Sequence, residues 1–154
     1  MALLKKGDSA PLFEGKDQNG NTIGLKNYLG KKIILYFYPK DLTPGCTDES
    51  CNLRDNYKEL AKKNFVVLGV SADDEESHRK FADKHSLPFP LIADTERKII
   101  IAYGAWGEKQ NYGKTYEGIL RTTYVIDEKG IIEEVFAKVD TKNHTQQIFE
   151  TLKI

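Results

Sequence analysis

The chain has 154 residues, 40% of them hydrophobic, which suits one compact domain over residues 1–154 with a substantial core. Its 23 basic and 23 acidic side chains give a formal net charge of zero, so no overall field attracts nucleic acid or an anionic membrane surface. No apolar run approaches the roughly 20 residues of a membrane span, and no secretory signal is visible, so we expect a cytoplasmic protein.

The first half of the chain predicts a hairpin followed by a β-α-β unit. Extended segments are expected at 12–16, 22–24, 32–38 and 65–71, the first two joined by an Asn-Gly turn signal. A helix is predicted to begin near Thr43, because Leu53, Tyr57 and Leu60 recur farther along at helical spacing. Since this helix connects the last two strands, those strands should run parallel.

The second half continues the alternation. Helices are expected at 74–85, 95–103 and 143–152, and strands at 91–93, 121–126 and 131–137. Segment 104–118 has four glycines, two tyrosines and the only tryptophan, which indicates a long functional loop. The alternation ends in a β-β-α unit and predicts an α/β fold: a thioredoxin-like sandwich with a central mixed β-sheet flanked by helices and an N-terminal β-hairpin extension.

Cys46 is the most informative residue, because it lies where a strand passes through a proline turn into a helix. Pro39 cannot continue a strand ladder, Thr43 is a good N-cap, and Pro44 suits the first helical position. Cys46 then falls in the first turn, where free backbone N–H groups and the helix dipole favour negative charge. This position favours the thiolate, which is the reactive form of cysteine.

Cys51 follows with four residues between, and the two cysteines are the only ones in the chain. They either pack as small hydrophobes or form one redox couple. The polar residues around them favour the redox couple and predict that Cys46 is not deeply buried, although the nearby carboxylates of Asp48 and Glu49 oppose its ionisation. A zinc site is disfavoured and a Cys–His pair stays open. His78, His85 and His144 are expected to be ordinary surface or boundary residues and are assigned no role.

Helix geometry makes a separate prediction about these cysteines. If both lie in regular helix, their Cα atoms are about 8.6 Å apart. A disulfide requires about 7 Å or less, so the first turns must unwind before the bond can close. We therefore predict that oxidation increases amide exchange over 45–54 and leaves the strand at 32–38 protected.

Pro39, Thr43 and Cys46 form the Pro-x-x-x-Thr-x-x-Cys signature of the peroxiredoxins. The chain resembles the PrxQ or bacterioferritin comigratory protein subfamily over essentially its whole length, through the segments 37–51, 103–109 and 113–116 and through Arg121. The resemblance implies that Cys46 is the peroxidatic cysteine and Cys51 the resolving cysteine. It also implies that Pro39, Thr43 and Arg121 complete the peroxide site.

The function implied by this resemblance is a thioredoxin-dependent thiol peroxidase. Hydrogen peroxide or a small organic hydroperoxide oxidises Cys46 to a sulfenic acid, and Cys51 condenses with it to an intramolecular disulfide. Thioredoxin or a similar dithiol then restores both thiols. No metal, haem, flavin or other cofactor is expected, and the protein should be a monomer or a weak dimer.

Two alternative functions have different sequence requirements. A thioredoxin-like disulfide oxidoreductase uses two residues between its cysteines rather than four, and its cis-proline has no counterpart here, because the prolines end at Pro90. A non-enzymatic redox sensor would use the Cys46–Cys51 disulfide to switch a partner surface. Catalytic turnover of peroxide separates the peroxidase from both.

The supporting residues also have more than one interpretation. Arg121 has a planar, permanently charged group that suits a thiolate and a peroxide, yet an arginine at a strand start also fits a surface ion pair. Thr43 can cap the helix and donate its hydroxyl to sulfur at once. Several aromatic residues either pack in the core or form an apolar collar around Cys46: Trp106, Tyr112, Tyr116, Phe89 and Tyr38.

Overall fold

The structure is a computed structural model that describes residues 3–154. Its strands are β1 (Glu14–Lys16), β2 (Thr22–Gly24), β3 (Lys32–Phe37), β4 (Phe65–Ser71), β5 (Leu91–Ala93), β6 (Trp106–Asn111), β7 (Lys114–Ile119), β8 (Thr122–Ile126) and β9 (Ile132–Phe136). Its helices are the 3-10 helix η1 (Leu25–Tyr28), α1 (Pro44–Asp55), α2 (Tyr57–Lys62), α3 (Glu75–His85), α4 (Lys98–Ala102) and α5 (His144–Leu152).

Seven of the strands form one mixed sheet in the order β2-β1-β5-β4-β3-β8-β9. The central strands β3, β4 and β5 run parallel, as the β-α-β pattern predicts. On one side β8 and β9 continue antiparallel, and on the other the β1–β2 hairpin joins through the pair Lys16 and Ala93. The thioredoxin-like fold and its N-terminal hairpin are thereby confirmed.

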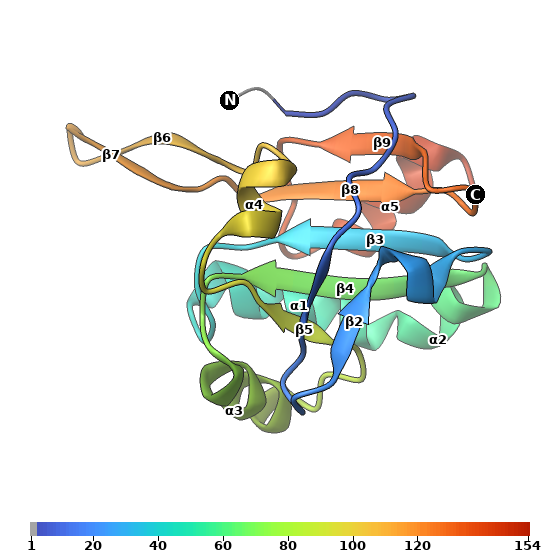
Figure 1. Ribbon diagram of the computed structural model, residues 1–154, viewed down its shortest axis with the longest axis horizontal. Coiled ribbons are helices and arrows are strands. Elements are labelled where there is room, and N and C mark those ends of the chain that lie inside the picture. Colours follow the sequence, from blue (N-terminus) through green and yellow to red (C-terminus); the bar gives the residue numbers. More distant parts are fainter. Residues whose placement is uncertain (1–2) are drawn as a thin grey trace.

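Apolar side chains cover both faces of this sheet, because alternate residues of a strand point to opposite sides. One face packs against α1, α2, α3 and α5 through Leu53, Leu60, Phe81 and Ile148. The other packs against η1 and α4 through Leu25, Ile99 and Ile100. Figure 1 shows α4 in front of the sheet and α1, α2 and α5 behind it. Because α1 follows β3 in the chain, its N-terminal end lies near the C-terminal end of this strand.

Two helices are shorter than expected. The helix after β3 is interrupted at Asn56, whose side-chain amide donates to the Asn52 carbonyl at 2.8 Å alongside its own backbone N–H. Such side-chain competition weakens a helix locally. The helix expected from residue 95 begins only at Lys98, because Arg97 has a left-handed conformation with φ of 61°. Both differences are local and leave the layer order unchanged.

Segment 104–118 is a two-stranded hairpin, so the expectation of a long loop was wrong. Its turn is made by Tyr112 and Gly113, which have φ angles of 51° and 77°. Two consecutive positive φ angles are typical of the tight turn that matches strand twist, although the usual Asn-Gly pair is absent from this turn. The hairpin extends away from the sheet (Figure 1). Among the helices described in residues 3–154, none is long and apolar enough to cross a bilayer.

Candidate active site

Cys46 is the third residue of α1 and its side chain is fully buried. The expectation of an accessible thiol was therefore wrong. The reason is the helical spacing of the inward residues Cys46, Glu49, Ser50 and Leu53, which places them on one face of α1 against the sheet. The polar residues that suggested exposure belong largely to other faces of the same helix.

Arg121 contacts the sulfur directly, with its Nη2 donating to Cys46 Sγ at 3.3 Å. The sheet brings the two together: β3 and β8 are antiparallel neighbours, and Phe37 at the end of β3 pairs with Thr122, the residue after Arg121. Gly45 allows this approach, because a Cβ atom there would lie 3.2 Å from Nη2. The contact places Arg121 beside the Cys46 sulfur, and its ion-pair partner is the buried Glu49 rather than a surface carboxylate.

Glu49 holds the other arm of the guanidinium. Arg121 Nη1 donates to Glu49 Oε1 at 2.8 Å, and the carboxyl group is fully buried. Burial raises the pKa of Glu49 to about 7, although the neighbouring Arg121 opposes the shift. Our sequence interpretation treated Glu49 only as an opposing charge. Its position three residues after Cys46 was the signal that both lie on one helix face.

His144, at the start of α5, closes the far side of this charged cluster. Its Nε2 lies 3.7 Å from Glu49 Oε2, an oxygen without a hydrogen-bond partner in the described chain. The ring is held by Thr123 Oγ1 at 2.8 Å and Gln147 Oε1 at 2.9 Å. Burial lowers the pKa of His144 to about 4, so the imidazole is neutral at pH 7. The expectation that it is an ordinary boundary residue was wrong.

The loop between β3 and α1 carries Pro39 and Thr43. Thr43 occupies the N-cap position, but its hydroxyl donates to the Lys40 carbonyl at 2.7 Å. The hydroxyl oxygen accepts no N–H of α1 in this structure, and its single proton goes to Lys40 rather than to the sulfur. Pro39 is half-buried and lies two residues beyond β3, at the turn expected for it.

Asp41 anchors the same loop to the protein body. It accepts from Tyr38 Oη at 2.6 Å and from Ser77 Oγ at 2.8 Å, and it contacts His78 Nδ1 at 2.7 Å. His78 is fully buried and its Nε2 faces the Ile92 carbonyl, so this histidine is not a surface residue either.

Asp41, Asp73 and His78 lie close enough to hold a metal ion, but their facing atoms are already hydrogen-bonded to one another and to Ser71 and Ser77. The cluster is a hydrogen-bonded anchor for the Cys46 loop.

Cys51 also lies within α1, and both cysteines are free thiols. Both cysteines thus lie in one helix, which is the arrangement for which we predicted a separation of about 8.6 Å between their Cα atoms. Cys51 is half-buried, and burial raises the pKa of its thiol although Arg54 opposes the shift. Its sulfur lies 3.7 Å from Nδ1 of His85, to which no role was assigned from the sequence.

The aromatic residues of the hairpin lie outside the apolar cluster that contains Cys46. Tyr112 is 97% exposed and Tyr116 is 45% exposed, so neither packs in the core. Trp106 is half-buried beneath Arg97, whose guanidinium lies 4.7 Å from the ring centroid. Tyr38 and Phe89 instead share the buried cluster that contains Cys46. The apolar surroundings of the Cys46 thiol thus include side chains of the sheet and of the segment that leads into β5.

Known proteins resemble this chain over nearly its full length. The profile of the AhpC/TSA family matches residues 6–135. Peroxiredoxin Bcp of Bacillus subtilis is 46% identical over 97% of this chain and 96% of that protein, and Peroxiredoxin Bcp of Escherichia coli is 45% identical over 99% and 98%. A solved PrxQ structure from Xylella fastidiosa superposes with a TM-score of 0.92 at 29% identity, covering 99% of this chain and 98% of that one.

Proposed function

Because the chain belongs to the AhpC/TSA family, and within it to the Bcp/PrxQ peroxiredoxins, which are thiol peroxidases, we propose that Cys46 is the peroxidatic and Cys51 the resolving cysteine. The observation that carries this assignment is the 3.3 Å contact between Arg121 and the buried Cys46 sulfur. A buried thiolate requires a paired positive charge, and Arg121 supplies one that does not titrate away. Among the described residues, Cys51 has no comparable guanidinium contact to its sulfur.

The peroxide step needs a nucleophile and a stabilised leaving oxygen. In our proposal the Cys46 thiolate attacks one peroxide oxygen and becomes a sulfenic acid, and the other oxygen leaves as water or an alcohol after protonation. Arg121 and the free N–H groups at the start of α1 stabilise the charge that develops on the leaving oxygen. Pro39 shapes the loop, and Thr43 can donate to the substrate once its hydroxyl turns away from Lys40.

The buried ion pair orients the arginine for this step. Glu49 holds Nη1 of Arg121 at 2.8 Å, which leaves Nη2 directed at the Cys46 sulfur. Burial acts to lower the pKa of Arg121, but the charges of Cys46 and Glu49 together outweigh it, so the pKa is raised. A guanidinium held at two points gives up little freedom when the peroxide binds, which is the condition for preorganised stabilisation.

Resolution follows when Cys51 attacks the Cys46 sulfenic acid and forms an intramolecular disulfide. Because both residues lie in α1, we propose that the first turns of this helix open to bring the sulfurs together. Thioredoxin or a similar dithiol then reduces the disulfide. The resting state needs two reduced thiols, so the cycle suits a reducing compartment such as the cytoplasm.

The substrates in this proposal are hydrogen peroxide and small organic hydroperoxides. The bacterioferritin comigratory protein of Xanthomonas campestris is described for its alkyl peroxide reduction activity, and it superposes with a TM-score of 0.86 at 31% identity. We extend the organic substrate class to this chain from that likeness. We further propose that residues 1–154 act as a single domain, as a monomer or a weak dimer.

A coupled assay tests substrate, reaction and reductant together. Peroxide loss is followed with thioredoxin, thioredoxin reductase and NADPH, with the Cys46→Ser variant as the blank. We expect sustained turnover with hydrogen peroxide and with a small alkyl hydroperoxide. Consumption of a single stoichiometric amount of peroxide would favour the redox sensor. Faster reduction of a protein disulfide than of peroxide would favour the disulfide oxidoreductase.

A further inference from the structure

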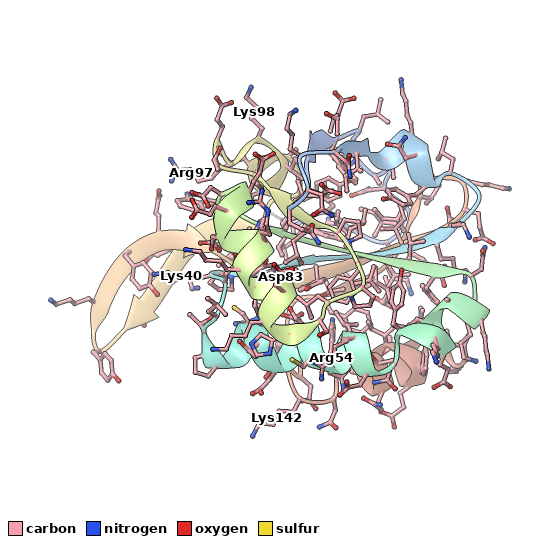
Figure 2. The ribbon with its side chains drawn as sticks, turned by 90° about the horizontal axis from the view of Figure 1, so that it is seen from below. Lys40, Arg54, Asp83, Arg97, Lys98 and Lys142 are labelled. Atoms are coloured by element: carbon pink, nitrogen blue, oxygen red, sulfur yellow. The ribbon has the colours of Figure 1, made fainter. Side chains whose placement is uncertain are left out.

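Cys51 faces a histidine from another helix. His85 is the last residue of α3, and its Nδ1 lies 3.7 Å from the Cys51 sulfur. Figure 2 shows α3 reaching α1 where Arg54 is labelled. We propose that His85 is the general base of the resolving step and takes the proton from the Cys51 thiol, an inference that rests on the function proposed above.

The imidazole is held in place from two sides. Arg54 Nη1 donates to the His85 carbonyl at 2.7 Å, which ties the end of α3 to the turn of α1 that follows Cys51. The ring packs edge-on against Phe81, with centroids 5.5 Å apart and an interplanar angle of 79°. The first contact uses the backbone carbonyl of His85 and the second uses the carbon skeleton of its ring. Neither occupies Nδ1, which faces the Cys51 sulfur. His85 is half-buried and can exchange its proton with water.

Cys51 needs such a base because its surroundings favour the thiol. Burial raises the pKa of Cys51, and Asp55 and Asp48 of the same helix add to this shift, while Arg54 alone opposes it. Only the thiolate is an effective nucleophile towards the sulfenic acid. Imidazole is the side-chain base suited to accept a proton near neutral pH. The pair therefore supplies a thiolate where the local charges would not.

The reaction balances as follows. The S–H bond of Cys51 breaks and its proton passes to His85 Nδ1. The thiolate electron pair forms the bond to the Cys46 sulfur as the S–O bond of the sulfenic acid breaks. Hydroxide leaves and is protonated by solvent, and His85 returns its proton to solvent, so the products are the disulfide and one water. The oxidising equivalent comes from the peroxide consumed in the preceding step.

The position of His85 outside α1 determines the order of events. Proton transfer occurs while α1 is intact, because Cys51 Sγ and His85 Nδ1 are in contact in the reduced structure. Opening of the first turns of α1 then carries the thiolate towards Cys46, while α3 need not move. His85 thus acts only on the second chemical step and has no contact with the peroxide site.

Rapid-quench kinetics on the full chain separate the two steps, with mass analysis of Cys46 sulfenic acid and of the disulfide after mixing with hydrogen peroxide. His85→Gln keeps a hydrogen-bond acceptor for the S–H group but cannot take its proton. His85→Ala removes the acceptor and the base together. Lys84→Gln, at the exposed end of α3, is the matched control. We expect sulfenic acid to form at the wild-type rate in all three. Disulfide formation should slow by about tenfold or more in both His85 variants, because general-base catalysis typically contributes at least that much.

Two further readouts exclude a packing role for His85. Added imidazole should accelerate disulfide formation in His85→Ala, and the variants should approach the wild-type rate at alkaline pH, where hydroxide ionises Cys51 unaided. A wild-type rate of disulfide formation in His85→Gln would overturn the proposal, as would a defect that persists at alkaline pH. Absence of sulfenic acid in the wild-type protein would instead overturn the proposed function itself.

Discussion

The two cysteines of α1 occupy contrasting surroundings, although only four residues separate them. Cys46 is fully buried, with its sulfur 3.3 Å from Arg121 and with the Glu49 carboxylate behind that arginine. Cys51 is half-buried, and its sulfur lies 3.7 Å from Nδ1 of His85. One helix thus presents a strongly charged, preorganised site on its inner face and a partly solvated thiol on another. In our proposal, peroxide chemistry at Cys46 and resolution by Cys51 are separate tasks supported by these different neighbours.

Replacing each cysteine by serine should break this contrast most completely. Cys46→Ser should abolish peroxide consumption, since it removes the nucleophile. Cys51→Ser should consume about one equivalent of peroxide and stop as a sulfenic acid open to further oxidation. Peroxide loss and intact mass measure both outcomes. An inert Cys51→Ser protein in the first turnover would show that the roles are reversed.

Arg121→Ala tests the charged surroundings of Cys46 alone. The peroxide step should slow by the equivalent of about 2–4 kcal/mol, which is typical for loss of one preorganised stabilising donor. Stopped-flow measurement of Cys46 oxidation gives this rate, and Arg79→Ala, an exposed arginine on α3, is the control. If Arg121→Ala oxidises as fast as the control, the 3.3 Å contact with sulfur has no catalytic role.

The pH dependence of stability sharpens the account of the buried cluster. Burial raises the pKa of Glu49 from 4.5 to about 7, so the folded protein retains this proton longer and the Glu49 contribution to stability falls as pH rises through that window. Burial lowers the pKa of His144 from 6.5 to about 4, so the His144 contribution rises with pH between those values. In the wild-type protein the two contributions largely offset each other.

Single variants should separate these opposing contributions. Relative to the wild type, the free energy of unfolding of Glu49→Gln should increase by up to about 3 kcal/mol between the lower and upper pH of its window. The difference for His144→Gln should decrease with pH by a similar amount. Urea unfolding across the pH range measures both differences. Two curves that stay parallel to the wild type would show that neither group is perturbed.

Gly45→Ala should have the smallest effect. Its new Cβ would lie 3.2 Å from Arg121 Nη2, so the arginine must shift by a few tenths of an ångström. Alanine also favours the helix by about 0.5–1 kcal/mol over glycine. We expect a peroxide step slowed about threefold to tenfold, since about 1 kcal/mol of lost contact corresponds to that range, in a protein at least as stable as the wild type. An unchanged rate would show that the exact position of Nη2 is unimportant.

Local patterns were sufficient to predict the sheet and the position of Cys46 at the start of a helix. The strand at 32–38, the proline turn and the N-cap residue Thr43 are all local signals, and β3 and α1 form where they indicate. The burial of Cys46 was not predictable in this way, because it depends on tertiary contacts such as the one with Arg121, which lies just before β8. A single sequence gives the charge of Glu49 but not its partner, and a surface carboxylate was the simpler interpretation.

The β6–β7 hairpin and His85 were missed for related reasons. The hairpin turn uses Tyr112 and Gly113, a pair without the usual turn signal, so the glycine-rich composition suggested a loop. His85 meets Cys51 only because α3 packs against α1, a contact between residues 34 positions apart. Such pairings arise from tertiary packing and leave no periodic trace in the sequence.

The central claim is that α1 holds the two sulfurs apart and must open for the disulfide to close. Amide hydrogen exchange in the reduced and disulfide forms tests it most directly. We predict faster exchange over 45–54 in the disulfide form, while the strand β3 stays protected in both forms. Equal protection of 45–54 in the two forms would contradict the account, because the bond would then have formed within an intact helix.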